Sequence, residues 1–275
     1  MNRFTIAIYV ILDDILKSVN HFEDPQRRVN DAMVITTLMV ACQYFGGNIE
    51  KARLYMKSHH CKEMLSKSQF NRRMHRNRDL IESIFGLFAY IFKQDNHHGN
   101  FLVDSFPVAV CHNIRIANCQ LLDDDLFRGK CVSKRTYFYG FKVAVLTTEE
   151  GLPVEIAFLP GSYHDSQFLN RMHYDVPPNA SIFGDNAFQN YEFEDTAAEL
   201  DQINWEVCRN SRSLRGDIYQ IKLWKKQMRR YVESIFSAID ALFPKSIHAV
   251  TINGFLLKTF LFVFTYGVHK WLPEF

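Results

Sequence analysis

The sequence predicts a helical N-terminal region followed by an α/β domain whose mixed sheet is covered by helices. Up to about residue 94, apolar residues recur at helical spacing. Beyond residue 100, three apolar strands follow one another, and later strands alternate with helices. Consecutive strands followed by strand–helix alternation predict a sheet with both antiparallel and parallel neighbours.

Composition favours a folded protein with local charge. The chain has 275 residues, of which 47% are hydrophobic, so it can form one large and one small domain and is too apolar to be disordered. The net charge is only +2, but residues 51–78 and 209–230 are strongly basic and residues 185–206 are acidic. Such blocks can bind a polyanion locally without making the whole chain basic.

The cysteines and the apolar segments favour an intracellular protein without a membrane span. The six cysteines are scattered and lack C-x-x-C spacing, which indicates reduced thiols and no zinc site. Residues 1–15 carry two aspartates and no small-residue cleavage site, as expected for a helix and not for a signal peptide. Residues 252–271 approach the ~20 residues of a membrane span, yet a buried core helix is the better interpretation.

In the helical region, cap and stop signals set the expected elements. Asp31 can cap a helix that Gly46 and Gly47 end, and a second helix follows over residues 49–57. Ser66 or Ser68 can cap a short helix over residues 69–76.

The short helix has an apolar face with Phe70 and Met74. Its other faces are polar and basic, with Gln69, Asn71, Arg72, Arg73 and Arg76. This is typical of a recognition helix in a DNA groove, but equally of a solvated helix face, and both interpretations stay open.

A polar linker over residues 96–100 divides the chain into a helical region, 1–95, and a second domain, 96–275. The second domain starts with strands at 101–104, 137–147 and 154–159, and then a helix at 168–173. After these we expect a strand at 181–184, a helix at 191–200, a strand at 203–208 and a long helix around Glu233.

Three acids stand at informative places in this order. Asp104 and Asp185 each follow an apolar strand, and Glu233 lies beside the apolar stripe of the long helix. Either aspartate alone is best explained as a turn or helix cap, but the strand ends of an open sheet also form its functional crevice. Together the three carboxylates could hold two Mg²⁺ ions roughly 3.5–4 Å apart.

Five segments carry a family resemblance. They are residues 103–108 (VDSFPV), 139–142 (YGFK), 160–165 (PGSYHD), 184–188 (GDNAF) and 229–236 (RRYVESIF). In this order they resemble the blocks of a DDE transposase of bacterial insertion sequences, most closely insertion-sequence family 982. Residues 66–75 are similar to the basic N-terminal helix of that family.

The resemblance implies an RNase H-like catalytic domain over residues 96–275, preceded by a small all-α DNA-binding domain over residues 1–95. It implies Asp104, Asp185 and Glu233 as the catalytic, metal-binding triad, with Mg²⁺, replaceable by Mn²⁺, as two ions. The expected partners are double-stranded terminal inverted repeats and target DNA, bound by a homo-oligomer on paired ends. The expected location is the bacterial cytoplasm, on the nucleoid when DNA is bound.

Related transposases carry a Tyr, Arg, Glu, Lys signature on the last catalytic helix. Arg229 and Glu233 match it, whereas Lys226 stands at the Tyr position and Asp240 at the Lys position. Lys226, Lys245 or Lys258 are candidates to replace the missing lysine.

Further residues are candidates for contact with DNA phosphates or for the metal site. A basic loop is expected to bind phosphate in preference to being merely solvated, and Lys142 is a weaker candidate. For His164 and Asp165, capping of the next helix is favoured over approach to the metal site. The full DNA-binding set is Arg229, Lys226, Lys142, Arg209, Arg212, Arg215, Arg72, Arg73 and Arg76.

The sequence thus predicts a transposase that cleaves phosphodiester bonds at element ends and joins the freed 3′-hydroxyl to target DNA. One alternative is a structure-specific nuclease of the same fold, such as a junction resolvase, which would not join strands. The other is a transposase-derived repressor that binds DNA but has lost catalysis, an alternative that the residues at positions 226 and 240 support.

Overall fold

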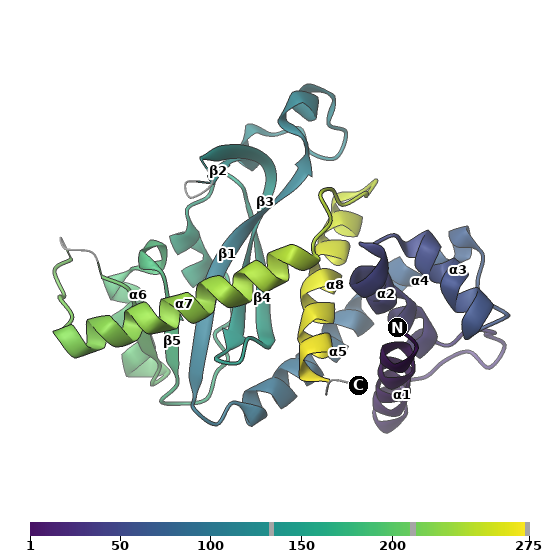
Figure 1. Cartoon of the computed structure of the whole chain (residues 1–275), viewed down its shortest axis with the longest axis horizontal. Coiled ribbons are helices and arrows are strands. Elements are labelled where there is room, and N and C mark those ends of the chain that lie inside the picture. Colours follow the sequence, from purple (N-terminus) through teal and green to yellow (C-terminus); the bar gives the residue numbers. More distant parts are fainter. Residues whose placement is uncertain (132–134, 210–212, 273–275) are drawn as a thin grey trace. The chain divides into compact units, whose positions relative to one another are not determined.

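The computed structural model describes residues 1–131, 135–209 and 213–272 and divides the chain into two compact units. A helical unit comprises residues 1–86 and 242–275, and an α/β unit comprises residues 87–241 (Figure 1). The helices are α1 (Asn2–Ser18), α2 (Asp31–Phe45), α3 (Ile49–His59), α4 (Lys67–Arg76), α5 (Arg78–Asp95), α6 (Tyr191–Leu200), α7 (Tyr219–Leu242) and α8 (Ile252–Trp271).

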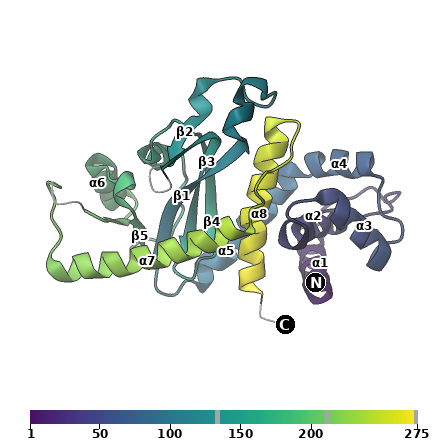
Figure 2. The same cartoon turned by 45° about the horizontal axis from the view of Figure 1, so that its top comes forward.

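The helical unit is built around α2, which is buried along most of its length. Figure 2 shows α1, α3 and α4 gathered around it. The N-cap of α2 is Asn30 and not the predicted Asp31, because the Asn30 side chain accepts a hydrogen bond from the Met33 backbone N–H. Gly46 ends the helix in the left-handed conformation with φ 54°, where a side chain would be strained. Ser66 and Gln69 form a capping box at the start of α4.

The last helix, α8, belongs to the helical unit. It packs against α2, and Phe260 and Phe264 place their ring centroids 5.0 and 5.4 Å from that of Phe85. The division therefore differs from the predicted boundary at residues 95 and 96. The physical reason is that α8 is apolar on nearly all sides and finds a helical partner for its faces within this unit.

Among the described residues, no single helix is long and apolar enough to cross a membrane, although α2 and α3, bent by 114° at their junction, pass as a pair on length and composition. In α8, the buried residues occur around the whole helix, as predicted for a core helix.

The α/β unit contains one mixed sheet. Its strands are β1 (Asn100–Cys111), β2 (Arg128–Cys131), β3 (Thr136–Thr148), β4 (Pro153–Pro160), β5 (Ser181–Gly184) and β6 (Asn204–Val207). The spatial order is β4-β3-β1-β5-β6, with β2 paired to the first residues of β3. The β4-β3-β1 pairs are antiparallel and the β1-β5-β6 pairs are parallel. This confirms the predicted RNase H-like five-stranded sheet and adds the short strand β2.

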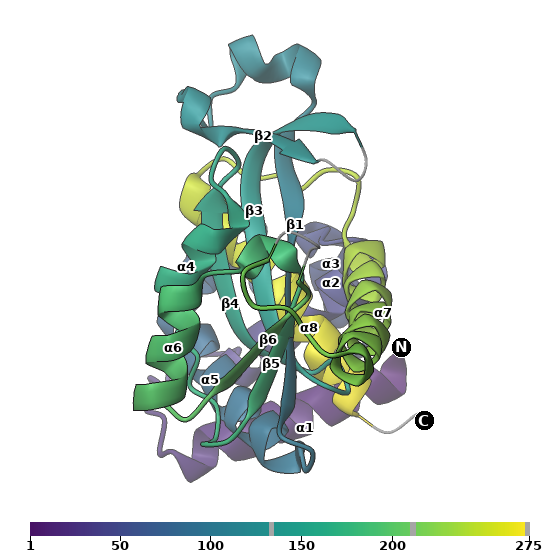
Figure 3. The ribbon, with the colours of Figure 1, turned by 90° about the vertical axis from the view of Figure 1, so that its left-hand side faces the viewer.

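Helices cover both faces of this sheet. Figure 3 shows α7 along one face and α6 on the opposite face. The predicted apolar stripe of α7 is buried, with Met228, Val232, Ile235, Phe236 and Ile239 turned inward. Phe236 meets Phe106 of β1, and Trp224 meets Phe183 of β5, at centroid distances of 6.3 and 4.6 Å. The stripe thus fixes α7 across the two strands that carry the site.

The described part of the α/β unit also contains four short 3₁₀ helices: η1 (Asn113–Asn118), η2 (Asp125–Phe127), η3 (Asp165–Asn170) and η4 (Asn186–Phe188). The helix predicted at 168–173 is η3, which begins three residues earlier. Its N-cap is His164, whose ring nitrogen accepts a hydrogen bond from the Ser166 backbone N–H. His164 takes the capping role that was considered for Asp165.

Candidate active site

Asp104 and Asp185 lie level with each other on adjacent strands. The parallel pairing of β1 with β5 ends at Leu102 and Phe183, so two residues further on Asp104 comes beside Asp185. Asp185 follows β5 directly, as predicted. Asp104 is not at a strand end, because β1 continues to Cys111 along β3 and pairs Asp104 with Val145. Beyond Leu102, the edge of β1 that faces β5 is no longer paired with that strand, while the other edge stays paired with β3.

A small cavity of about 40 Å³ brings all three predicted acids together. Nine residues from β1, β5, β6 and α7 line it: Asp104, Phe183, Gly184, Asp185, Glu206, Lys225, Arg229, Val232 and Glu233. A single water needs about 10–15 Å³ of such volume. The cavity therefore has room for a metal ion and a water, but not for a larger ligand.

Backbone N–H groups orient both aspartates. The Ser105 N–H donates to Asp104 Oδ1 at 2.7 Å, and the Ala187 N–H donates to Asp185 Oδ1 at 2.6 Å. Each carboxylate has a second oxygen. Asp185 thereby caps η4, so its predicted capping role and its place in the cavity are compatible.

The negative charges of Asp104 and Asp185 are unfavourable because both carboxylates are buried near other carboxylates. Burial raises the pKa of Asp104 to about 7, and the negative charges of Asp185 and Asp165 add to the effect. The Ser105 hydrogen bond and the positive charge of Arg229 act in the opposite direction. Asp104 keeps some solvent-accessible surface at the cavity but is otherwise enclosed by protein atoms. Burial also raises the pKa of Asp185.

Glu233 lies at the cavity with a side chain that is 63% accessible, although its α7 neighbours Val232 and Phe236 are buried. Its Oε1 accepts a hydrogen bond from Arg229 Nε at 3.1 Å, one turn earlier on α7. Such exposed i,i+4 pairs contribute about 0.3–0.5 kcal/mol, so Glu233 can turn toward the aspartates at little cost.

The carboxylate oxygens of Asp104, Asp185 and Glu233 do not all lie within 4.8 Å of one another, as ligands of one metal ion would. In the part of the chain that the structure describes, the one group of three or more metal-ligating side chains with atoms within 4.8 Å of one another is His21, Glu23 and Asp31. Even so, the donor set of the cavity fits a divalent cation. Carboxylate oxygens are the ligands of Mg²⁺, and a cation would relieve the repulsion that raises the aspartate pKa values.

Two further charged residues of the cavity were not predicted. Lys225 is buried, and its Nζ contacts Asp217 Oδ1 at 2.7 Å and Glu206 Oε2 at 2.9 Å. The signal was present in the sequence, because Lys225 falls three and seven residues before Met228 and Val232 of the buried stripe. Glu206, on β6, has no such signal, since its place depends on which strand lies next to β5.

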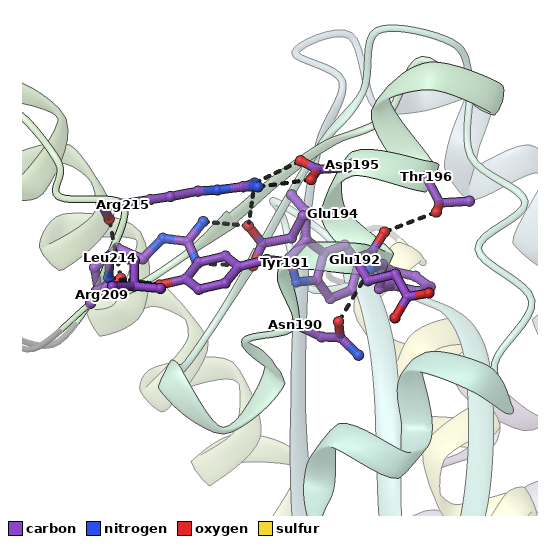
Figure 4. A network of polar contacts seen from close by, with 12 residues as sticks. Asn190, Tyr191, Glu192, Glu194, Asp195, Thr196, Arg209, Leu214 and Arg215 are labelled. Atoms are coloured by element: carbon purple, nitrogen blue, oxygen red, sulfur yellow. Dashed lines mark hydrogen bonds and ion pairs between the residues drawn. The ribbon is translucent and has the colours of Figure 1, made fainter.

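Two arginines of the predicted basic loop, Arg209 and Arg215, pair with acidic residues of α6. Arg209 donates to both carboxylate oxygens of Glu194 at 2.9 and 2.5 Å, and both side chains are buried. Arg215 donates to both oxygens of Asp195 at 2.6 and 2.7 Å. Figure 4 shows these pairs around the Tyr191 ring, whose centroid is 5.3 Å from the Arg209 guanidinium carbon and 4.7 Å from that of Arg215.

The acidic side chains of α6 therefore neutralise Arg209 and Arg215. Arg212 lies outside the described residues. Contact of Arg209 or Arg215 with a phosphate would have to compete with these bidentate pairs.

The other candidates for DNA contact divide into exposed and engaged side chains. Lys226, Arg72 and Arg76 are exposed. Lys142 Nζ contacts Asp165 Oδ1 at 2.9 Å, and Arg229 pairs with Glu233. Arg73 is not on the basic face, because its side chain is 12% exposed and donates to Asp31 Oδ1 at 2.5 Å.

A larger cavity, of about 480 Å³, lies in the helical unit. Lys245 and Lys258, two candidates for the missing signature lysine, line it together with Lys67 and Phe262. None of the three predicted acids does. Of the three candidate lysines, Lys226 is the one within the α/β unit, on the same helix as Glu233.

The sheet order, with carboxylates from β1, from the end of β5 and from α7 around one cavity, defines an RNase H-like domain with an acidic centre. A family comparison specifies this class. The chain belongs to the family described as Transposase DDE domain, whose model matches residues 94–244, more than half of the chain. No curated protein and no solved structure matches it. Membership implies a nuclease or transposase enzyme that binds DNA, and such enzymes generally use divalent metal ions.

Proposed function

We propose that this protein is the transposase of a bacterial insertion sequence related to family 982. It would cut phosphodiester bonds at terminal inverted repeats and join the freed 3′-hydroxyl to target DNA. The observation that carries the proposal is that Asp104, Asp185 and Glu233 line one small cavity within the segment matched by the transposase family model.

In this proposal the three carboxylates hold divalent cations, which supply activation of a water or hydroxyl nucleophile and neutralisation of developing phosphate charge. The chain's own contribution is position. The Ser105 and Ala187 N–H groups fix one oxygen of each aspartate, and Glu233 completes the set by turning away from Arg229. Arg229 is then released to contact a phosphate at the mouth of the cavity.

The DNA partner is proposed from exposed cations in each unit. Lys226 lies on the exposed side of α7, and Arg72 and Arg76 are exposed on α4. We assign Lys226 to the cleaved phosphate backbone, and α4 to recognition of the terminal repeat. A homo-oligomer on paired DNA ends follows from the family resemblance.

The test uses DNA carrying the inverted repeats that flank the gene. Asp104→Ala, Asp185→Ala and Glu233→Ala are each expected to abolish Mg²⁺- or Mn²⁺-dependent end cleavage while repeat binding is retained. Glu199→Ala, an exposed carboxylate on α6, is the matched control and should cleave normally. Full cleavage by all three site variants would refute the assignment.

The same assay separates the two alternatives. A structure-specific nuclease would cut branched DNA without a terminal repeat and give no joined product. A repressor would bind the repeat without cutting it, and the departures at Lys226 and Asp240 are the observation in its favour. Strand-transfer products made by the unmodified protein would exclude both.

A further inference from the structure

A fourth carboxylate, Asp165, lies beside the proposed metal centre. It is the first residue of η3, and its side chain is 24% exposed. Its Oδ1 accepts hydrogen bonds from Ser105 Oγ of β1 at 3.0 Å and from Lys142 Nζ of β3 at 2.9 Å. Two donors on two adjacent strands therefore fix a carboxylate that comes from a separate segment.

Ser105 links Asp165 to Asp104. Its backbone N–H donates to Asp104 Oδ1, while its hydroxyl donates to Asp165 Oδ1. On the other side, η3 packs against η4, which begins directly after Asp185. Asp165 is thus tied through its neighbours to both aspartates of the cavity.

The charge of Asp165 acts on both aspartates. Asp165 is close enough for its negative charge to act on Asp104 and on Asp185. Lys142 and Arg229 supply two positive charges against Asp104, Asp165, Asp185 and Glu233, which leaves an excess of negative charge for a cation to balance.

We propose that Asp165 is a fourth carboxylate of the cation site, with Ser105 and Lys142 as the positioning residues that hold it. The proposal rests on the proposed metal centre and extends its ligand set beyond the predicted triad. Through its second oxygen, Asp165 binds the divalent ion or a water on that ion. Lys142 then acts toward Asp165, which accounts for a cation on β3 without a contact to DNA.

The test is Mn²⁺ binding by the full-length protein without DNA, measured by electron paramagnetic resonance of free Mn²⁺. Asp165→Asn is expected to weaken Mn²⁺ affinity about 10- to 100-fold, the range found when outer ligands of metal sites are changed. Asp175→Asn is the matched control, because Asp175 also pairs with a lysine, Lys93, in the same unit. It should bind Mn²⁺ as the unmodified protein does.

Lys142→Met separates a cation-site role from a simple ion pair. If Asp165 serves the cation, Lys142→Met retains or tightens Mn²⁺ binding, since one competing positive charge is removed. Asp165→Asn should then weaken binding in the Lys142→Met background as well. Unchanged Mn²⁺ affinity in Asp165→Asn overturns the proposal.

Two more variants keep the test decisive. If Asp165→Asn lowers the unfolding temperature of the metal-free protein, the measurement is repeated with Ser105→Ala. This variant keeps the charge of Asp165 and removes one of its hydrogen-bond donors, so it must still weaken Mn²⁺ binding. Normal Mn²⁺ binding by Ser105→Ala refutes the role of Asp165 at the cation site. Asp104→Asn distinguishes the two levels of the proposal. If it binds Mn²⁺ normally, the metal centre itself fails. If it loses Mn²⁺ while Asp165→Asn does not, only the fourth carboxylate fails.

Discussion

Two buried carboxylates, Asp31 in the helical unit and Asp104 in the α/β unit, have pKa values shifted in opposite directions. Asp31 is 2% exposed. Burial alone would raise its pKa, but hydrogen bonds from His21, Asn77 and Arg73 together lower it. Among the described residues, Asp104 accepts one hydrogen bond, from the Ser105 N–H, and burial raises its pKa to about 7.

We interpret Asp31 as a structural carboxylate and Asp104 as a carboxylate suited to bind a cation. His21, Glu23 and Asp31 have the spacing of a metal site, yet Arg27 and Arg73 already contact Asp31 at 3.1 and 2.5 Å. A cation there would face two arginines. Around Asp104 the neighbouring charges are mostly negative, so a cation lowers the free energy of the folded state. Ligand spacing alone therefore favours the His21, Glu23 and Asp31 cluster as a metal site, whereas charge balance favours the carboxylates around Asp104.

The largest expected effect is on Asp31. Asp31→Ala leaves Arg73 and Asn77 without their shared partner, and loss of one member of a buried ion pair costs about 3–5 kcal/mol. Urea unfolding should show this loss as a lower midpoint, with Asp14→Ala, an exposed acid of α1, as the control. A change below about 1 kcal/mol would mean that the cluster is not structural.

The opposite sign is expected for Asp104 in metal-free protein. Between pH 4 and 7 the folded state retains a proton on Asp104 that the unfolded chain, with a pKa of 3.8, has released. The contribution of this group to stability is therefore present below pH 4 and is lost as pH rises to about 7, by up to about 4 kcal/mol. Asp104→Asn should unfold at a higher urea concentration than the unmodified protein at pH 8, and the gain should vanish at pH 4. A lower midpoint at pH 8 would contradict the raised pKa.

Divalent metal should stabilise one cluster and not the other. At Mn²⁺ concentrations 100-fold above the dissociation constant, binding adds about 2.7 kcal/mol to the free energy of unfolding. Thermal unfolding with and without Mn²⁺ should show this gain in the unmodified protein and in His21→Ala, and no gain in Asp104→Asn. Loss of the gain in His21→Ala would move the metal site to the helical unit.

The smallest effect is expected at the Arg229–Glu233 pair. Both side chains are more than half exposed, so Arg229→Gln should change the free energy of unfolding by less than about 0.5 kcal/mol. Its effect should appear in DNA cleavage instead. A large loss of stability would show that Glu233 is held by Arg229 and is not free to join the aspartates.

Much of the fold follows from the sequence because residue periodicity is local information. The helix predicted at 191–200 coincides with α6, the five predicted strands are present, and the predicted apolar stripe of α7 is buried. The short strand β2 was missed, since Arg128–Cys131 has no apolar run and becomes a strand only by pairing with β3.

The site was predicted in its composition but not in its geometry. Their places after apolar strands and beside the stripe of the long helix, together with the family resemblance, selected Asp104, Asp185 and Glu233, which do line one cavity. Their use as catalytic ligands stays a prediction. The order of residues along the chain does not reveal that the Glu233 side chain is exposed, that Lys225 is buried, or that Asp165 contacts Ser105 and Lys142.

What the sequence by itself determined is the kind of element at each position and the residues able to bind a cation or a phosphate, because both depend on side-chain type and short-range spacing. Only the tertiary structure decided which charges meet. It paired Arg209 and Arg215 with α6, Arg73 with Asp31, and α8 with the helical unit. The reason is that the energy of a charge depends on neighbours brought from distant segments. Arginine side chains therefore neutralise Asp31, whereas the charges around Asp104 are mostly negative.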